Sequence, residues 1–89
     1  MIKRGKLEIM RDILKVIQEN HNLIKPTPLL RKSNISSSRF KEYYSELINK
    51  ALIKEINENE DKFIILTDKG FKFLERYKTI IEFIDEFEL

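Results

Sequence analysis

Residues 35–54 read Ile-Ser-Ser-Ser-Arg-Phe-Lys-Glu-Tyr-Tyr-Ser-Glu-Leu-Ile-Asn-Lys-Ala-Leu-Ile-Lys, and we expect the rest of the chain to be organised around them. Its apolar side chains recur at steps of three and four residues, which places them on one face of a helix. They are Phe40, Tyr44, Leu47, Ile48 and Ala51. We expect this face to belong to the core. We also expect Ser36 or Ser37 to cap the helix by accepting a backbone N–H.

The other positions of this helix are polar or cationic and crowd toward its N-terminus. They are Ser37, Ser38, Arg39, Lys41, Glu42 and Ser45. The first turn of a helix presents N–H groups that bind phosphate oxygens, and short hydroxyl side chains beside an arginine can approach base edges. This pattern is typical of a helix that reads a groove of DNA.

Upstream, residues 7–20 carry apolar side chains at helical spacing and are expected to form a core helix. Residues 20–22 would end it, because asparagine tolerates the left-handed conformation of a C-cap. His21 is the single histidine of the chain. We interpret it as a surface residue, since a metal ligand or catalytic base needs partner groups. Residues 23–25 are expected to form a short edge strand, because Pro26 disfavours helix at the residue before it.

A second, shorter helix is expected next. Thr27 suits the N-cap and Pro28 the first helical position, so the helix would run over residues 29–33. Residues 34–36 would form the turn that follows, with Ile35 buried. A short helix, a turn and a longer helix are the outline of a helix-turn-helix, although any two packed helices share it.

Two strand-like segments follow the longer helix. Residues 52–57 and 62–66 are rich in β-branched and aromatic side chains, and residues 58–61 form a polar turn between them. A β-hairpin in this position is called a wing. Three helices and a wing make a compact α+β domain, so the order of elements predicts a winged helix-turn-helix.

The tip of the wing is acidic. It reads Asn57-Glu58-Asn59-Glu60-Asp61, whereas wings that contact DNA carry Arg or Lys there. A duplex would repel the carboxylates of this tip. We therefore expect the tip to point away from DNA, with at most Lys54 or Lys62 near a phosphate, and we favour a plain solvated hairpin tip.

Residues 67–89 are expected to form one long helix that Thr67 caps. An apolar series runs along it in steps of four, three, four and three residues: Phe73, Tyr77, Ile80, Ile84 and Phe87. Ile81 lies beside this series. A helix of about 20 residues is roughly 30 Å long and outruns a domain of this size. We therefore expect it to pair with the same helix of a second chain.

An antiparallel pair would set the acidic end of this helix against the basic end of its partner. The acidic residues are Glu82, Asp85, Glu86 and Glu88, and the basic residues are Lys69, Lys72, Arg76 and Lys78. A parallel pair would set acid against acid. The alternative is a monomer in which the helix folds back over its own domain.

The charges of the chain are divided between its two parts. Residues 1–54 carry 12 Lys and Arg against 5 Asp and Glu, and they begin with a short basic lead-in. Residues 55–89 carry 5 against 10. The first part is therefore suited to a polyanion, although two solvated surfaces with an accidental bias would look the same.

Several classes of function are disfavoured. The 89 residues suffice for one small domain, and they include no cysteine, one histidine and two glycines. These residues supply no thiolate metal site, glycine-rich phosphate loop or nucleophile–base pair, so we expect no enzyme, metal, cofactor or small-molecule ligand. Neither a signal peptide nor an apolar run of about 18 residues is present. We expect no membrane partner and a cytoplasmic, nucleoid-associated location.

Four motifs resemble those of the small archaeal winged-helix regulators. They are Thr27-Pro28-Leu29-Leu30, Asn34-Ile35-Ser36, Tyr43-x-x-x-Leu47-Ile48-x-Lys50-Ala51-Leu52-Ile53 and Leu66-Thr67-Asp68-Lys69-Gly70. The similarity covers nearly the whole chain. The final helix is similar to that of dimeric archaeal DNA-binding proteins whose C-terminal helices pair as an antiparallel coiled coil. The family usually has glycine at the position of Ala51, a departure that is expected to leave the fold intact.

The resemblance implies that exposed residues of the longer helix face the DNA groove: Ser37, Ser38, Arg39 and Lys41. Together with the helix-turn-helix pattern, it gives the predicted DNA-binding set Arg31, Lys32, Ser36, Ser37, Ser38, Arg39 and Lys41. Lys15 is expected to help track the backbone. The predicted dimer contacts are Phe73, Tyr77, Ile80, Ile81, Ile84 and Phe87.

The sequence as a whole predicts a mainly helical α+β protein. Residues 1–66 would form the winged helix-turn-helix domain, and residues 67–89 its continuous dimerisation helix. The expected partner is double-stranded DNA, bound by a homodimer with residues 36–50 in the major groove, as in a transcriptional regulator or a general DNA-binding protein. The alternative is a winged helix used for protein–protein contact without DNA binding.

Overall fold

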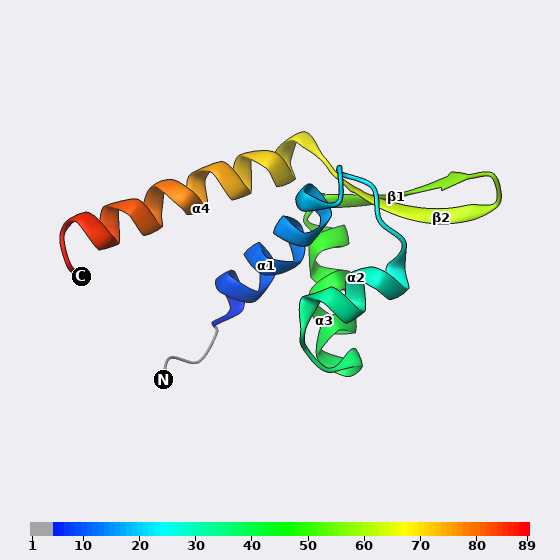
Figure 1. Ribbon diagram of the computed structural model, residues 1–89, viewed down its shortest axis with the longest axis horizontal. Coiled ribbons are helices and arrows are strands. Elements are labelled where there is room, and N and C mark those ends of the chain that lie inside the picture. Colours follow the sequence, from blue (N-terminus) through cyan, green and yellow to red (C-terminus); the bar gives the residue numbers. More distant parts are fainter. Residues whose placement is uncertain (1–4) are drawn as a thin grey trace.

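The computed structural model describes residues 5–89. In this part of the chain the elements follow in the order α1 (Lys6–Glu19), α2 (Pro26–Ser33), α3 (Ser37–Asn49), β1 (Ile53–Glu58), β2 (Asp61–Leu66) and α4 (Asp68–Glu86) (Figure 1). The mainly helical α+β fold is therefore confirmed. The start of the basic lead-in, residues 1–4, lies outside the described residues. That these residues help the basic part of the chain to bind a polyanion stays a prediction.

One apolar core lies between the first three helices, the hairpin and the start of α4. Its largest fully buried side chains come from α1, α2, α3 and the hairpin: Ile9, Ile13, Leu14, Ile17, Leu29, Leu47, Ile53 and Ile64. Each side chain of this size stabilises the fold by about 1.5–3 kcal/mol when it leaves water. Most of the apolar stripes that predicted α1 and α3 thus face the core, but Leu7, at 60%, and Ala51 are exposed.

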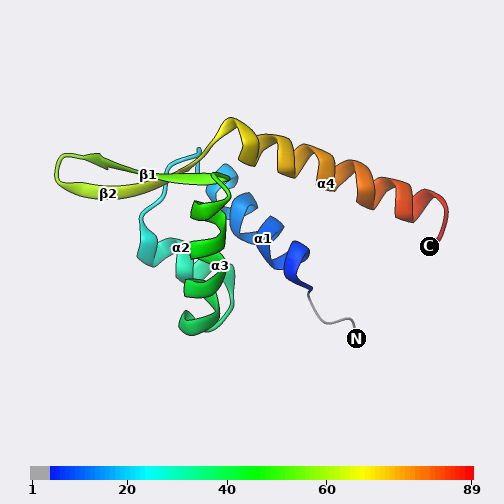
Figure 2. The ribbon, with the colours of Figure 1, turned by 180° about the vertical axis from the view of Figure 1, so that it is seen from behind.

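The hairpin and the distal half of α4 project from opposite ends of the helical body, as views from the front and from behind agree (Figures 1 and 2). The molecule measures 49 × 27 × 22 Å along its principal axes. The molecule is therefore longer than its single core, and the hairpin and the end of α4 both have surface that a partner could contact.

Strands β1 and β2 pair antiparallel, from Ile53 opposite Leu66 to Glu58 opposite Asp61. The two turn residues, Asn59 and Glu60, have φ angles of 52° and 67°. Two successive positive φ angles match the right-handed twist of a hairpin. The wing expected from the sequence is present, with each strand shifted or extended by one residue.

A short segment before α2 pairs with the free edge of β2 at a single residue. The backbone of Ile24 exchanges hydrogen bonds with Ile64, with N···O distances of 3.2 and 2.7 Å. The pairing is an isolated bridge. The expected edge strand is therefore reduced to one residue, which pairs with β2 at the buried residue Ile64.

Two local expectations were wrong. Helix α2 begins at Pro26, with Lys25 as its N-cap and no capping side chain, so Thr27 lies inside the helix. Pro26 suits the first helical position because its φ angle is preset and it has no N–H to satisfy. Ala51 is exposed and has a φ of 59°, so it lies beyond the end of α3 and contributes nothing to the buried face.

The first turn of α4 is fastened to the end of α3 through three successive carbonyl oxygens. Lys69 Nζ donates to the oxygen of Lys50 at 2.8 Å, and Thr67 Oγ1 donates to that of Ala51 at 2.6 Å. The backbone N–H of Thr67 donates to the oxygen of Leu52 at 3.1 Å. These carbonyls have no partner within α3, so the joint satisfies them. We call this contact the α3–α4 joint.

Candidate nucleic-acid interface

The N-terminus of α3 is built by serines, as the sequence predicts. Ser36 is the N-cap, and its Oγ accepts the backbone N–H of Arg39 at 3.3 Å. Its Oγ also lies 3.4 Å from that of Ser38. Asn34, with a φ of 57°, ends α2 in the left-handed conformation and so makes the sharp turn between the helices.

The face of α3 that points away from the core is polar along its whole length. Exposed residues follow each other at helical spacing on this face: Ser38, Glu42, Ser45 and Asn49. The opposite face carries Phe40, which is 8% exposed, and Leu47, which is buried. This amphipathic helix is therefore held by its apolar side and presents short polar side chains outward.

A groove of about 530 Å³ runs beside this face, between α2, α3 and the wing. It is lined by Pro26, Thr27, Leu30, Ser37, Ser38, Phe40, Lys41, Tyr44, Glu55 and Lys62. Three predicted DNA-binding residues, Ser37, Ser38 and Lys41, are thus brought together on one wall. Their hydroxyl and ammonium groups are donors of the kind that bind phosphate oxygens.

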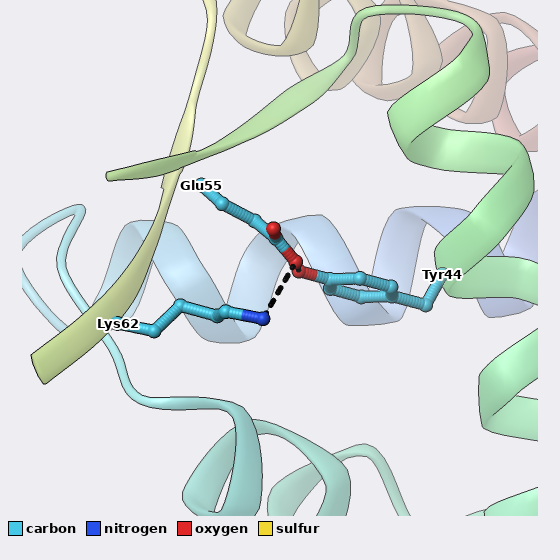
Figure 3. A network of polar contacts seen from close by, with 3 residues as sticks. All are labelled: Tyr44, Glu55 and Lys62. Carbon is cyan, nitrogen blue, oxygen red and sulfur yellow. Dashed lines mark hydrogen bonds and ion pairs between the residues drawn. The ribbon is translucent and has the colours of Figure 1, made fainter. Parts of the chain in front are cut away.

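Tyr44, Glu55 and Lys62 meet on the wing side of this groove (Figure 3). The Tyr44 hydroxyl donates a hydrogen bond to Oε2 of Glu55, and Nζ of Lys62 lies 3.7 Å from the same oxygen. Burial raises the pKa of the Tyr44 phenol above its usual range, and the hydrogen bond and charge of Glu55 raise it further. The phenol therefore stays protonated and remains a donor at neutral pH.

The other predicted DNA-binding residues lie apart from the groove. The Arg39 guanidinium lies 5.9 Å from the centroid of the Tyr43 ring, a distance at which a cation is attracted to the ring face. Lys32 donates to the side chain of Asn20 at 3.2 Å, and Arg31 is exposed in the same last turn of α2. Lys15 lines a different hollow, between α1 and α4.

The predicted dimer residues divide into two groups. Phe73 and Tyr77 are half-buried against their own domain, and Arg11 of α1 lies 5.2 Å from the Tyr77 ring centroid. Ile84 is half-buried near the end of α4. Ile80, Ile81 and Phe87 are 57%, 39% and 58% exposed. The outer part of α4 is therefore the part with an uncovered apolar surface.

The wing tip is exposed and acidic as expected. Asp61 pairs with Lys25 at 3.5 Å, and Lys25 in turn lies 5.7 Å from the centroid of the Phe63 ring. Lys54 is exposed on β1. At most Lys54 or Lys62 was expected near a phosphate, and of these two Lys62 lines the groove and Lys54 does not.

Sequence reasoning missed the part that Tyr44 and Glu55 play in the groove. Tyr44 was interpreted as a core residue because its spacing matches the apolar stripe. Glu55 carried a signal, since strand alternation places it on the same face as buried Ile53. The Glu55 side chain is 37% exposed, and its carboxylate has the Tyr44 hydroxyl as a hydrogen-bond partner.

The sequence of residues 3–85 matches a winged helix-turn-helix family over nearly the full chain. The chain belongs to the winged helix-turn-helix family. Among curated protein sequences, none matches it significantly. The family assignment agrees with the order of the helices and the wing, and it confirms the resemblance seen in the sequence.

Solved structures of other winged-helix proteins are similar to this winged helix-turn-helix protein. Sso10a-2, a DNA-binding protein from Sulfolobus solfataricus, has a TM-score of 0.76 at 22% identity, over 96% of this chain and 86% of its own. F93 from STIV, a winged-helix DNA-binding protein, gives 0.71 at 23%, over 81% and 85%. F-93 of SSV1 gives 0.69 at 27%, over 90% and 88%.

Within residues 5–89, no group of His, Cys, Asp and Glu side chains is arranged to hold a metal ion. The described helices of this winged helix-turn-helix protein also include none that is long and apolar enough to cross a membrane. The structure places the polar face of α3 beside the groove, and it leaves the exposed end of α4 on the far side of the domain (Figure 1).

Proposed function

We propose that this protein binds double-stranded DNA as a homodimer, with α3 in the major groove. The observation that carries the proposal is the polar face of α3, which is exposed along the helix and flanked by a groove with Ser37, Ser38 and Lys41 on its wall. A helix of this kind fits a groove about 12 Å wide. The family and the DNA-binding proteins of similar fold support the same interpretation.

The roles of the residues follow from their positions. Ser37, Ser38 and Lys41 would bind phosphates or base edges beside the groove, and Arg39 would reach a base or phosphate from the flank of α3. Ser36 caps the helix that presents them. Arg31 and Lys32, at the end of α2, would follow the backbone next to the turn. A protein with these contacts would act in the cytoplasm on the nucleoid, as a transcriptional regulator or a general DNA-binding protein.

The dimer part of the proposal rests on the outer half of α4. Helix α4 has 19 residues and is therefore about 28 Å long. Its outer apolar side chains are largely exposed, Phe83 at 52% and Phe87 at 58%. An apolar surface of this kind marks an interface more often than it faces water. Antiparallel pairing of two such helices would bring the acidic end of each against the basic end of the other.

The test is the affinity for a fluorescently labelled random duplex, measured by anisotropy at several salt concentrations on protein whose mass is known from light scattering. We expect a dimer mass and an affinity that falls steeply with salt, because phosphate binding releases counterions. Arg39→Ala should weaken binding by about 1–3 kcal/mol if Arg39 reads a base. Lys41→Ala should lower the salt slope by about one.

Lys78→Ala is the matched control, because Lys78 lines the hollow between α1 and α4 and lies away from α3. Light scattering must show that this variant keeps the wild-type mass, since an antiparallel pair would set Lys78 against the acidic end of the partner helix. The variant should leave the affinity unchanged. An equal loss in Lys78→Ala and Lys41→Ala would remove α3 from its assigned role. No binding of any duplex at low salt, together with salt-insensitive binding of a protein partner, would favour the alternative function of a protein-interaction module.

A further inference from the structure

Glu55 is the one carboxylate among the residues that line the groove between α2, α3 and the wing. Two lysines, Lys41 and Lys62, share that lining with it. If α3 lies in the major groove, the adjacent phosphate backbone must pass this concave surface. A negative charge there opposes the phosphates, so the position of Glu55 calls for an explanation.

The contacts of Glu55 show what its charge does in the free protein. Its Oε2 accepts the hydrogen bond of Tyr44 and also lies 3.7 Å from Nζ of Lys62. Lys62 is therefore held by a carboxylate of its own chain. Half of the Lys62 side chain is still exposed, at 52%, so a phosphate can reach it once the carboxylate no longer competes.

Tyr44 keeps Glu55 in this place. The Tyr44 ring stacks on Phe40 with centroids 5.6 Å apart, and Phe40 is a core residue of α3. The hydroxyl is thus presented by a ring that the core fixes. Glu55 itself stands on β1 beside buried Ile53, which fixes its backbone. The carboxylate is consequently held by the Tyr44 hydroxyl and lies beside Lys62, while 37% of the Glu55 side chain stays exposed.

We propose that Glu55 limits the sequence-independent affinity of this protein for DNA by holding Lys62 and by repelling phosphate from the groove. The proposal rests on the proposed DNA-binding function and assigns a role to a residue outside its contact set. Phosphate contacts supply nearly all of the affinity for non-specific duplex, whereas base contacts carry the sequence information. A residue that weakens the phosphate term alone leaves the protein more dependent on its base contacts.

The test compares Glu55→Gln with the wild-type protein on random duplex. Glutamine keeps an oxygen that accepts the Tyr44 hydroxyl but has no charge, so the fold should persist, as a thermal melt would verify. We expect the affinity to rise about 3- to 10-fold, because one lysine becomes free and one repulsive charge is lost. The salt slope should become steeper by about one, the contribution of one additional phosphate contact.

Two further variants separate the release of Lys62 from a general change in charge. Glu58→Gln removes one negative charge from the wing outside the groove and should change the affinity less than 2-fold. Lys62→Met should also have little effect in the wild-type background, because Lys62 is already held by Glu55. In the Glu55→Gln background the same change should remove most of the gain.

Each result decides between the two levels of the proposal. Wild-type protein that binds DNA, with Glu55→Gln indistinguishable from it, would overturn the role of Glu55 and leave the proposed function standing. An equal gain in Glu58→Gln, or a gain that Lys62→Met leaves undiminished, would also overturn it. A complete lack of binding by wild type and Glu55→Gln at low salt would overturn the proposed function together with this inference.

Discussion

Ala51 occupies a backbone conformation that suits glycine better than alanine. Its φ of 59° lies in the left-handed region, where the Cβ of an L-residue approaches its own carbonyl oxygen and costs roughly 1–2 kcal/mol. Its side chain is exposed and contributes no core contact. The residue is retained in this conformation because the α3–α4 joint engages its carbonyl oxygen.

Ala51→Gly should therefore stabilise the protein, by about 0.5–1 kcal/mol after the greater flexibility of glycine in the unfolded chain is included. The midpoint of urea unfolding measures this change. Ser45→Gly, in the middle of α3, is the opposite control, because helical glycine should destabilise by a similar amount. A lower midpoint for Ala51→Gly would show that the strain is absent in solution.

At the scale of elements, the α3–α4 joint requires glycine at position 70. A Cβ at Gly70 would lie 2.2 Å from the carbonyl oxygen of Leu52, much closer than atoms that are not bonded approach each other. That oxygen already accepts the N–H of Thr67, so it cannot move without loss of a hydrogen bond. The close approach holds the first turn of α4 against the end of α3.

Gly70→Ala should destabilise the protein by about 1–3 kcal/mol, the usual effect of an added methyl group where no space exists. Gly5→Ala is a matched control within the same chain, because no atom lies within 4 Å of the position of its Cβ. Thermal unfolding followed by circular dichroism compares the two. Equal melting temperatures for both variants would show that α4 is free to shift away from Leu52.

The elements themselves were predictable because their signals are local. Apolar spacing located α1, α3 and α4, and the caps Ser36 and Thr67 both accept backbone N–H groups where the sequence placed them. The start of α2 was missed because Pro26 and Pro28 both suit the first helical position. In the structure the bridge between Ile24 and Ile64 holds the segment directly before Pro26, and the helix begins at Pro26. The local sequence gives no sign of this long-range contact.

The groove was less predictable because it depends on the angle between the wing and α3. Tyr44 and Glu55 are separated by 11 residues, and their contact forms only when β1 packs against α3. Spacing assigned Tyr44 to the core, which is correct for its ring, but spacing does not predict the partner of its hydroxyl. The sequence likewise placed Arg39 on the exposed surface. Its position over the Tyr43 ring was not predictable, because it depends on the side-chain conformations of both residues.

At the scale of the whole molecule, α4 and the wing lie at opposite ends and serve different surfaces (Figures 1 and 2). The basic groove between α3 and the wing is separated from the apolar end of α4 by the body of the domain. Pairing through α4 would therefore leave both copies of α3 free to face one duplex. Substitutions in α4 are expected to abolish dimerisation while each α3 keeps its own DNA contacts.

Ile80→Asp with Phe87→Asp should convert the proposed dimer to a monomer, because two charges would have to be buried in the apolar interface. Light scattering should report half the wild-type mass, while circular dichroism stays that of a folded domain, since both residues are more than half exposed. The monomer presents one α3 instead of two. Its affinity for random duplex should fall, and its salt slope should drop to about half.

Phe71→Asp is the control for this experiment. Phe71 is also exposed, at 38%, but it lies in the first turn of α4 and outside the apolar series that includes Ile80 and Phe87. This variant adds one negative charge to the same helix, where the double variant adds two, and it should keep the dimer mass and the wild-type salt slope. A monomeric wild-type protein, or a double variant that keeps the dimer mass, would show that α4 is not the dimer contact. A monomeric variant with an unchanged salt slope would show that one α3 suffices for DNA binding, because the number of phosphates engaged does not depend on pairing.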